Sequence, residues 1–209
     1  MPEKIRETSL SQTMNNPTTM KKMKTRAPPT LRRATISDVS LPSLTRCASP
    51  WVAFTAAADP WVAAELTELR AQGGLVCVLD GRDLHGPAAV FRTFARELSF
   101  PDYFGHNWDA LVDCLRDGHG HGHGHGQPYV AVLIEHADGL LGMDFLGVFI
   151  SVLCQASWHA NLRLDADGIP CEDEPPYALH FVLLLDRIPP AAFAKGVARG
   201  MDVGIDLTA

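Results

Sequence analysis

Short apolar runs alternate with amphipathic stretches along residues 51–186. Three runs have the length and apolar content of buried strands: Leu75–Leu79, Tyr129–Ile134 and Tyr177–Leu185. The stretches between them repeat apolar side chains at the spacing of helix turns. Strands that are apolar on both faces favour a parallel sheet covered by helices. The pattern therefore predicts an α/β domain.

Capping residues indicate where the helices begin. Pro87 is typical of a first helical position, and Asn107 can cap a helix from Trp108 to about Arg116. A mostly apolar helix is expected from about Phe145 to Ala160. We interpret it as a buried helix rather than a membrane span, because polar residues interrupt it and a span needs about 20 apolar residues.

The ends of the chain differ from its centre. Trp51–Phe54 is a short apolar run, and Asp59–Pro60 then predicts a helix start, so an N-terminal strand and helix precede the first long strand. Residues 1–50 have no sustained period, which predicts a disordered basic tail. We expect one domain over residues 51–186 and a C-terminal tail of uncertain structure over residues 187–209.

Charge is distributed unevenly along the 209 residues. Residues 1–50 hold nine Lys/Arg and three Asp/Glu, a net charge of +6, whereas residues 51–209 hold nine and twenty-one, a net charge of −12. Nucleic-acid binding normally needs clustered cations, and the acidic body has one lysine, Lys195. The balance argues against direct nucleic-acid binding and favours a basic protein partner.

An acidic row follows an aromatic loop on the helix that Asn107 caps. Asp109, Asp113 and Asp117 recur every four residues and share an outer face, while Tyr103–Gly105 precede them. Such a row can be a solvated face, but neighbouring aromatics are typical of binding hot spots. Carboxylates that point the same way do not suit acid–base catalysis, and the common catalytic motifs are absent, so no enzyme is predicted.

Two further groups bear on metals and cofactors. The imidazoles of a Gly-His repeat (His119, His121, His123 and His125) could bind Ni(II), Cu(II) or Zn(II), although a flexible linker is the favoured interpretation. The five cysteines have no C-x-x-C spacing, so they indicate reduced thiols in a cytoplasmic protein. No cofactor and no signal peptide are predicted.

Seven segments of the chain form a recognisable series: Leu79–Gly81, Phe94–Leu98, Pro101–Gly105, Asn107–Leu111, Asp113–Leu115, Pro128–Glu135 and Phe181–Leu185. In these segments the sequence resembles the barstar family, small cytosolic inhibitors of barnase-type ribonucleases. The resemblance covers about residues 75–185. It implies a three-stranded parallel sheet flanked by helices, to which this chain adds its N-terminal strand and helix. It also implies inhibition rather than catalysis, by a monomer in the cytoplasm.

The resemblance also implies which residues contact the partner, a basic ribonuclease or related toxin. Asp109 and Asp113 would replace RNA phosphate, and Tyr103 would be the aromatic contact. The full implied set is Tyr103, Phe104, Gly105, Asn107, Trp108, Asp109, Val112 and Asp113. The chain departs from the family's prototype at two of its positions. The prototype has Trp where this chain has Val112, and Glu where this chain has Gln155.

Two alternatives remain open from the sequence. The domain could be a barstar-like module that has lost inhibition and acts as a regulatory or scaffold partner. The chain could also handle metal through its Gly-His repeat.

Overall fold

A parallel sheet forms the centre of the fold. The computed structural model describes residues 41–118, 128–163, 169 and 177–202. Its strands are β1 (Val52–Ala56), β2 (Leu75–Asp80), β3 (Tyr129–Glu135) and β4 (Ala178–Leu185). They lie in the order β1-β4-β3-β2, and every pair is parallel. The α/β prediction is confirmed, and β1 adds a fourth strand to the three that the resemblance implied.

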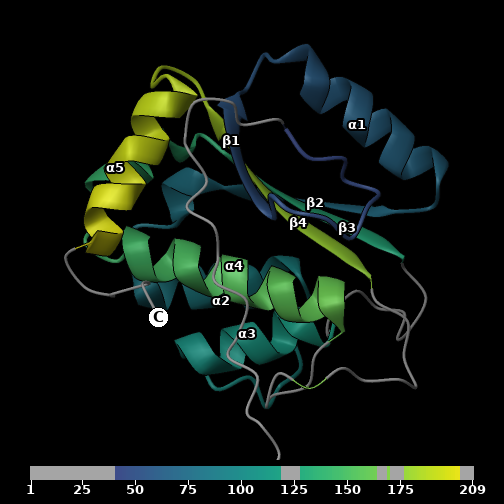
Figure 1. The fold of residues 1–209 in the computed structure, drawn as a ribbon. Coiled ribbons are helices and arrows are strands. Elements are labelled where there is room, and N and C mark those ends of the chain that lie inside the picture. The colour runs from purple at the N-terminus through teal and green to yellow at the C-terminus, as the bar shows by residue number, and fades with distance from the viewer. Residues whose placement is uncertain (1–40, 119–127, 164–168, 170–176, 203–209) are drawn as a thin grey trace, which may run out of the picture. The chain divides into compact units, whose positions relative to one another are not determined.

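The helices cover the sheet unequally (Figure 1). The helices are α1 (Pro60–Ala71), α2 (Pro87–Glu97), α3 (Trp108–Arg116), α4 (Leu146–Leu162) and α5 (Pro190–Asp202). In Figure 1, α1 lies on one face of the sheet, and α2, α4 and α5 lie on the other. The most extensive helix–helix packing in the described part of the chain joins α3 to α4. The sheet thus supports α4, and α4 in turn supports α3.

Apolar packing on both faces explains why β4 is buried along its whole length. The larger core contains the fully buried rings of Phe94, Phe149, Phe181 and Phe193, and a smaller core beneath α1 contains Leu69. Each large apolar side chain that is fully buried contributes about 1.5–3 kcal/mol. The continuous apolar run of β4 therefore reflects contact with both cores.

Predicted helix caps are confirmed. The Asp59 carboxylate accepts the backbone N–H of Trp61 at 2.9 Å, and the Asn107 side-chain oxygen accepts that of Ala110 at 2.8 Å. Both bonds satisfy N–H groups that have no partner inside their own helix. Local sequence therefore determines where α1 and α3 begin.

The packed part of the chain extends beyond residues 51–186 at its N-terminal side. Leu44, placed in the predicted tail, is 1% exposed, and its N–H donates to the Glu65 carboxylate at 2.8 Å. The His180 ring donates its Nε2–H to the Arg46 carbonyl at 2.8 Å. The segment of residues 41–50 is therefore anchored to the domain through Leu44 and the Arg46 carbonyl. The rest of the predicted tail, residues 1–40, lies outside the described residues.

The C-terminal segment also differs from the expectation. Residues 187–209 were expected to form a tail of uncertain structure, but they contain α5. The Phe193 ring is fully buried, with its centroid 5.2 Å from that of Phe54. Because α5 packs beside β1, the added N-terminal strand and the C-terminal helix stabilise each other. In the described part of the chain, no helix has both the length and the apolar content that crossing a bilayer requires.

Candidate functional site

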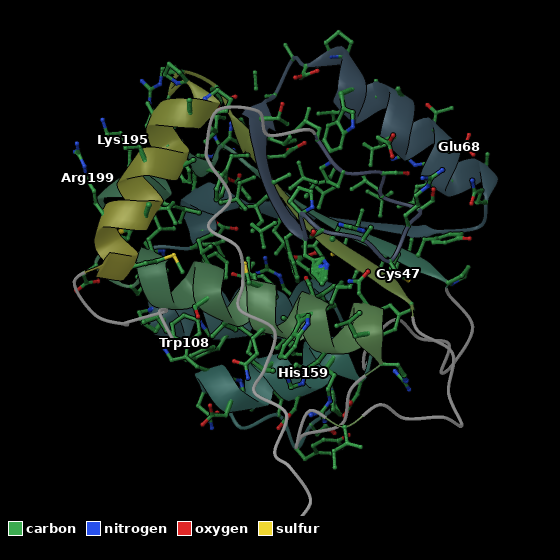
Figure 2. All side chains as sticks on the ribbon, viewed as in Figure 1. Cys47, Glu68, Trp108, His159, Lys195 and Arg199 are labelled. Carbon is green, nitrogen blue, oxygen red and sulfur yellow. The ribbon has the colours of Figure 1, made fainter. Side chains whose placement is uncertain are left out.

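Helix α3 is fixed by an aromatic cluster at its N-terminal end. The Trp108 ring centroid lies 4.8 Å from that of Phe91 on α2 and 6.3 Å from that of Phe149 on α4. Figure 2 labels Trp108 beside these helices. Trp108 is half-buried, so a large part of its side chain packs against neighbouring residues. A helix held this way presents its outer face in one orientation.

The loop before α3 divides its two aromatic rings between core and solvent. Phe104 is 5% exposed and packs against the rings of Phe91 and Phe100, at centroid distances of 6.4 and 5.0 Å. Tyr103 is 74% exposed. The structure therefore leaves Tyr103 exposed to solvent, whereas Phe104, also a predicted contact, anchors the loop from within.

Gly105 lies where the loop crowds the cap of α3. A Cβ added there would lie 3.0 Å from the Asn107 Nδ2 atom and 3.4 Å from the Ala110 Cβ atom. The contact with Asn107 Nδ2 is tight, so a larger residue at position 105 would press on the capping side chain. Gly105 and Asn107 therefore position the helix start rather than presenting large side chains to solvent.

The predicted acidic row lies on the outer face of α3. Asp109 and Asp113 are exposed, while Leu111, Cys114 and Leu115 on the opposite face are buried. Among the residues that the structure describes, Asp109 forms no ion pair. The Asp113 side chain is 57% exposed and lies 3.1 Å from Arg116. Both carboxylates are therefore accessible to solvent, but the negative charge of Asp113 is partly neutralised by Arg116 on the same helix.

The position of Val112 differs from the one that the sequence indicated. It was among the predicted contacts, yet it is 6% exposed and belongs to the larger core. Its small side chain lies inside the packing of α3. The apolar stripe of this helix is wider than the positions of Trp108, Leu111 and Leu115 indicated.

The C-terminal end of α3 is held by Tyr177, the residue that precedes β4. The Tyr177 hydroxyl donates to the carbonyls of Leu115 and Arg116, the latter at 3.0 Å. Burial raises the pKa of Tyr177, so the hydroxyl stays a donor. These bonds satisfy carbonyls that have no partner inside the helix. Both ends of the acidic helix are therefore tied to the rest of the domain.

Helix α4 carries an exposed apolar stripe that the sequence did not reveal. Val148, Trp158 and Leu162 are 39%, 43% and 45% exposed, and Gln155 is exposed on the same face. The sequence predicted a buried helix because apolar residues occur on every side of α4.

Asn161 donates to the Leu179 carbonyl at 2.9 Å, so α4 ends near the start of β4. Tyr177 ties α3 to the same region.

The arrangement suits binding better than catalysis. Asp109 and Asp113 project from one helix, so they do not face each other across a cleft. No group of three or more His, Cys, Asp or Glu side chains in the described residues could hold a metal ion. The described cysteines Cys47, Cys77, Cys114 and Cys154 are free. The Gly-His repeat, including His119–His125, lies outside the described residues.

Comparison with known proteins agrees with the resemblance noted in the sequence. Residues 75–164 match the family model Barstar (barnase inhibitor). A Bacillus subtilis (strain 168) protein named "Putative ribonuclease inhibitor YrdF" is 45% identical over 38 residues. That alignment covers 18% of this chain and 42% of the relative, so it spans less than half of the relative's length. The matched family segment contains the loop, α3 and the whole of α4.

Proposed function

We propose that this chain, whose residues 75–164 carry a barstar domain, binds a basic ribonuclease or related toxin and blocks its active site. The binding surface consists of the exposed face of α3, with Asp109 and Asp113, and of Tyr103 in the preceding loop. The observation that carries the proposal is that both carboxylates project from a helix locked at both ends, within the segment that matches the family.

Carboxylates suit this task because a ribonuclease holds RNA phosphate with cationic side chains. An exposed Asp can accept charge-assisted hydrogen bonds from Arg, Lys or protonated His in place of phosphate. Complementary charge also speeds the encounter of the two proteins. A rigid helix loses little conformational freedom on binding, which preserves the affinity that such contacts provide.

The remaining predicted contacts take different roles in this proposal. Tyr103 supplies an exposed aromatic ring beside the acids, as hot spots commonly do. Phe104 and Val112 support the surface from behind, and Trp108 with Asn107 orients the helix.

Inhibition assays test the proposal. The full chain is titrated into RNA hydrolysis by a panel of basic bacterial ribonucleases that includes barnase, and binding is measured in parallel. We expect the wild type to inhibit at least one enzyme. Asp109→Ala and Asp113→Ala should each weaken binding at least about thirtyfold, which corresponds to about 2 kcal/mol for a desolvated ion pair.

A matched control separates the interface from general charge. Glu68→Ala removes an exposed carboxylate from α1, across the sheet from α3 (Figure 2), and should leave inhibition unchanged. Equal losses in all three variants would contradict the assignment to α3. Tight binding without inhibition would instead favour the alternative of a regulatory or scaffold module.

A further inference from the structure

A cavity lies at an edge of the sheet to which α3 contributes no lining residue. It has a volume of about 480 Å³ and lies where β2, β3 and β4 end. The 3-10 helix η1 (Gly81–Asp83) follows β2, η2 (Ala137–Gly142) follows β3, and Asp186 follows β4. In parallel α/β sheets, small-molecule ligands bind at the carboxyl ends of strands, in cavities of this size.

The acids that line the cavity are already engaged. The Asp138 carboxylate accepts the backbone N–H groups of Asp186, Arg187 and Ile188 at 2.7, 3.0 and 2.7 Å. Burial by itself would raise the pKa of Asp138, but these donors outweigh it and lower the pKa. The Asp186 carboxylate lies 2.8 Å from His136 Nδ1. Both negative charges therefore have partners within the fold.

The cationic side chains of the lining are less fully engaged. Arg82 is paired with Asp80, its Nη2 2.6 Å from the carboxylate. In the part of the chain that the structure describes, the side chains of Arg187 and His85 form no hydrogen bond or ion pair. Both are exposed and border the cavity. Asp138 holds the backbone N–H of Arg187, so the residue stays at the cavity. The available donors favour an anionic ligand.

The rest of the lining is suited to a less polar part of a ligand. Met143 contributes an apolar side chain. Gly139 also lines the cavity, and a Cβ added there would meet no atom within 4 Å, so the space beside it is open. A ligand that fits both kinds of wall carries one anionic group and an uncharged organic body.

We propose that this cavity binds a small organic phosphomonoester of mononucleotide size, with its phosphate held by Arg187 and His85. The phosphate accepts charge-assisted hydrogen bonds from the guanidinium group and the imidazole. The organic body lies against Gly139 and Met143. This site is separate from the acidic face of α3, and it does not depend on the proposed inhibition.

Isothermal titration calorimetry on the full chain, in phosphate-free buffer, tests the proposal. The probes are AMP, ribose 5-phosphate, adenosine and inorganic phosphate. AMP and ribose 5-phosphate distinguish a nucleotide from a sugar phosphate, and at least one should bind. Adenosine and inorganic phosphate should each bind at least about tenfold more weakly than the better phosphomonoester, because each lacks one half of the ligand.

Variants then locate the site. Arg187→Gln and His85→Gln should each weaken the phosphomonoester about tenfold or more. Gly139→Phe should abolish binding by filling the cavity while the charges remain. Arg70→Gln on α1 removes a comparable exposed cation and should have no effect.

Three results would overturn the proposal. They are the absence of binding by both phosphomonoesters, an affinity for adenosine or inorganic phosphate equal to that for the phosphomonoester, and unchanged binding in Arg187→Gln. Thermal unfolding of each variant verifies that a loss of binding is not a loss of fold.

Discussion

Arg116 pairs with Asp113, a carboxylate of the proposed interface, and with Asp117, which follows α3. Its Nη1 lies 3.1 Å from Asp113 Oδ1, and its Nε lies 2.7 Å from Asp117 Oδ1. A cationic partner must therefore compete with Arg116 for Asp113. Asp109, one turn earlier, forms no ion pair with a described residue, so the two acids are not equivalent in the unbound protein.

The first prediction follows from this competition. Arg116→Gln should strengthen binding to the basic ribonuclease several-fold, mainly through faster association, because Asp113 then has no cationic neighbour on α3. The Arg116 side chain is only 15% exposed, so its replacement should also lower the free energy of unfolding, by about 0.5–3 kcal/mol. Stopped-flow association and chemical denaturation measure the two effects.

Arg199→Gln is the matched control for Arg116→Gln. It changes the net charge equally but lies exposed on α5 (Figure 2). An equal gain in both variants would indicate an effect of net charge rather than of the pairing with Asp113.

A second prediction concerns salt. If Asp109 and Asp113 meet a cationic surface, raising the ionic strength should slow association while changing dissociation less, because screening acts on charges that approach through water. Surface plasmon resonance over a series of NaCl concentrations separates the two rates. An association rate that is independent of salt would indicate an interface dominated by apolar contacts.

Substitutions of Trp108 and Tyr103 should differ in their effects, the first acting on stability and the second on ribonuclease binding. Trp108→Ala should lower the free energy of unfolding by about 2–3 kcal/mol, less than a fully buried Trp, because the ring packs on Phe91 and Phe149 but is only half-buried. Tyr103→Ala should leave stability within about 0.5 kcal/mol, since the side chain is 74% exposed, and should weaken ribonuclease binding. Urea denaturation and a binding titration distinguish them. A loss of stability in Tyr103→Ala without a loss of binding would indicate that Tyr103 stabilises the fold and does not contact the partner.

A fourth prediction concerns pH. Burial lowers the pKa of His180, whose ring donates to the Arg46 carbonyl. Below a pH of about 6.5, the unfolded chain takes up a proton at this histidine while the native protein resists it. Stability is therefore complete above that pH and falls on acidification, by at most about 1.4 kcal/mol per pH unit.

His180→Gln should reduce this dependence, measured as the difference in unfolding free energy between pH 7.5 and 5.5. His85→Gln removes an exposed histidine and serves as the control, in which the difference should remain. A dependence that is the same in His180→Gln as in the wild type would assign the titration to another group.

Elements that depend on long-range contacts were those that the sequence did not predict. Residues 41–50 have no periodic pattern, yet Leu44 is buried because α1 and β4 provide a surface for it. Helix α5 depends similarly on Phe54 and on its neighbours in the larger core. Residues 41–50 therefore carried no local signal, whereas Phe193, Val197 and Met201 of α5 recur every four residues, a helical spacing that the sequence-based prediction did not use.

The sequence by itself determined the buried strands, the capped starts of α1 and α3, and the row of acids along α3, because each depends on residues within a few positions of one another. Only the tertiary structure decided that Phe104 and Val112 point inward, that Trp158 is exposed, and that the strand ends border a cavity. Helical spacing relates side chains within one helix, but the neighbouring elements decide which of those side chains are covered. Which side chains of the proposed interface are exposed is therefore a property of packing as much as of sequence.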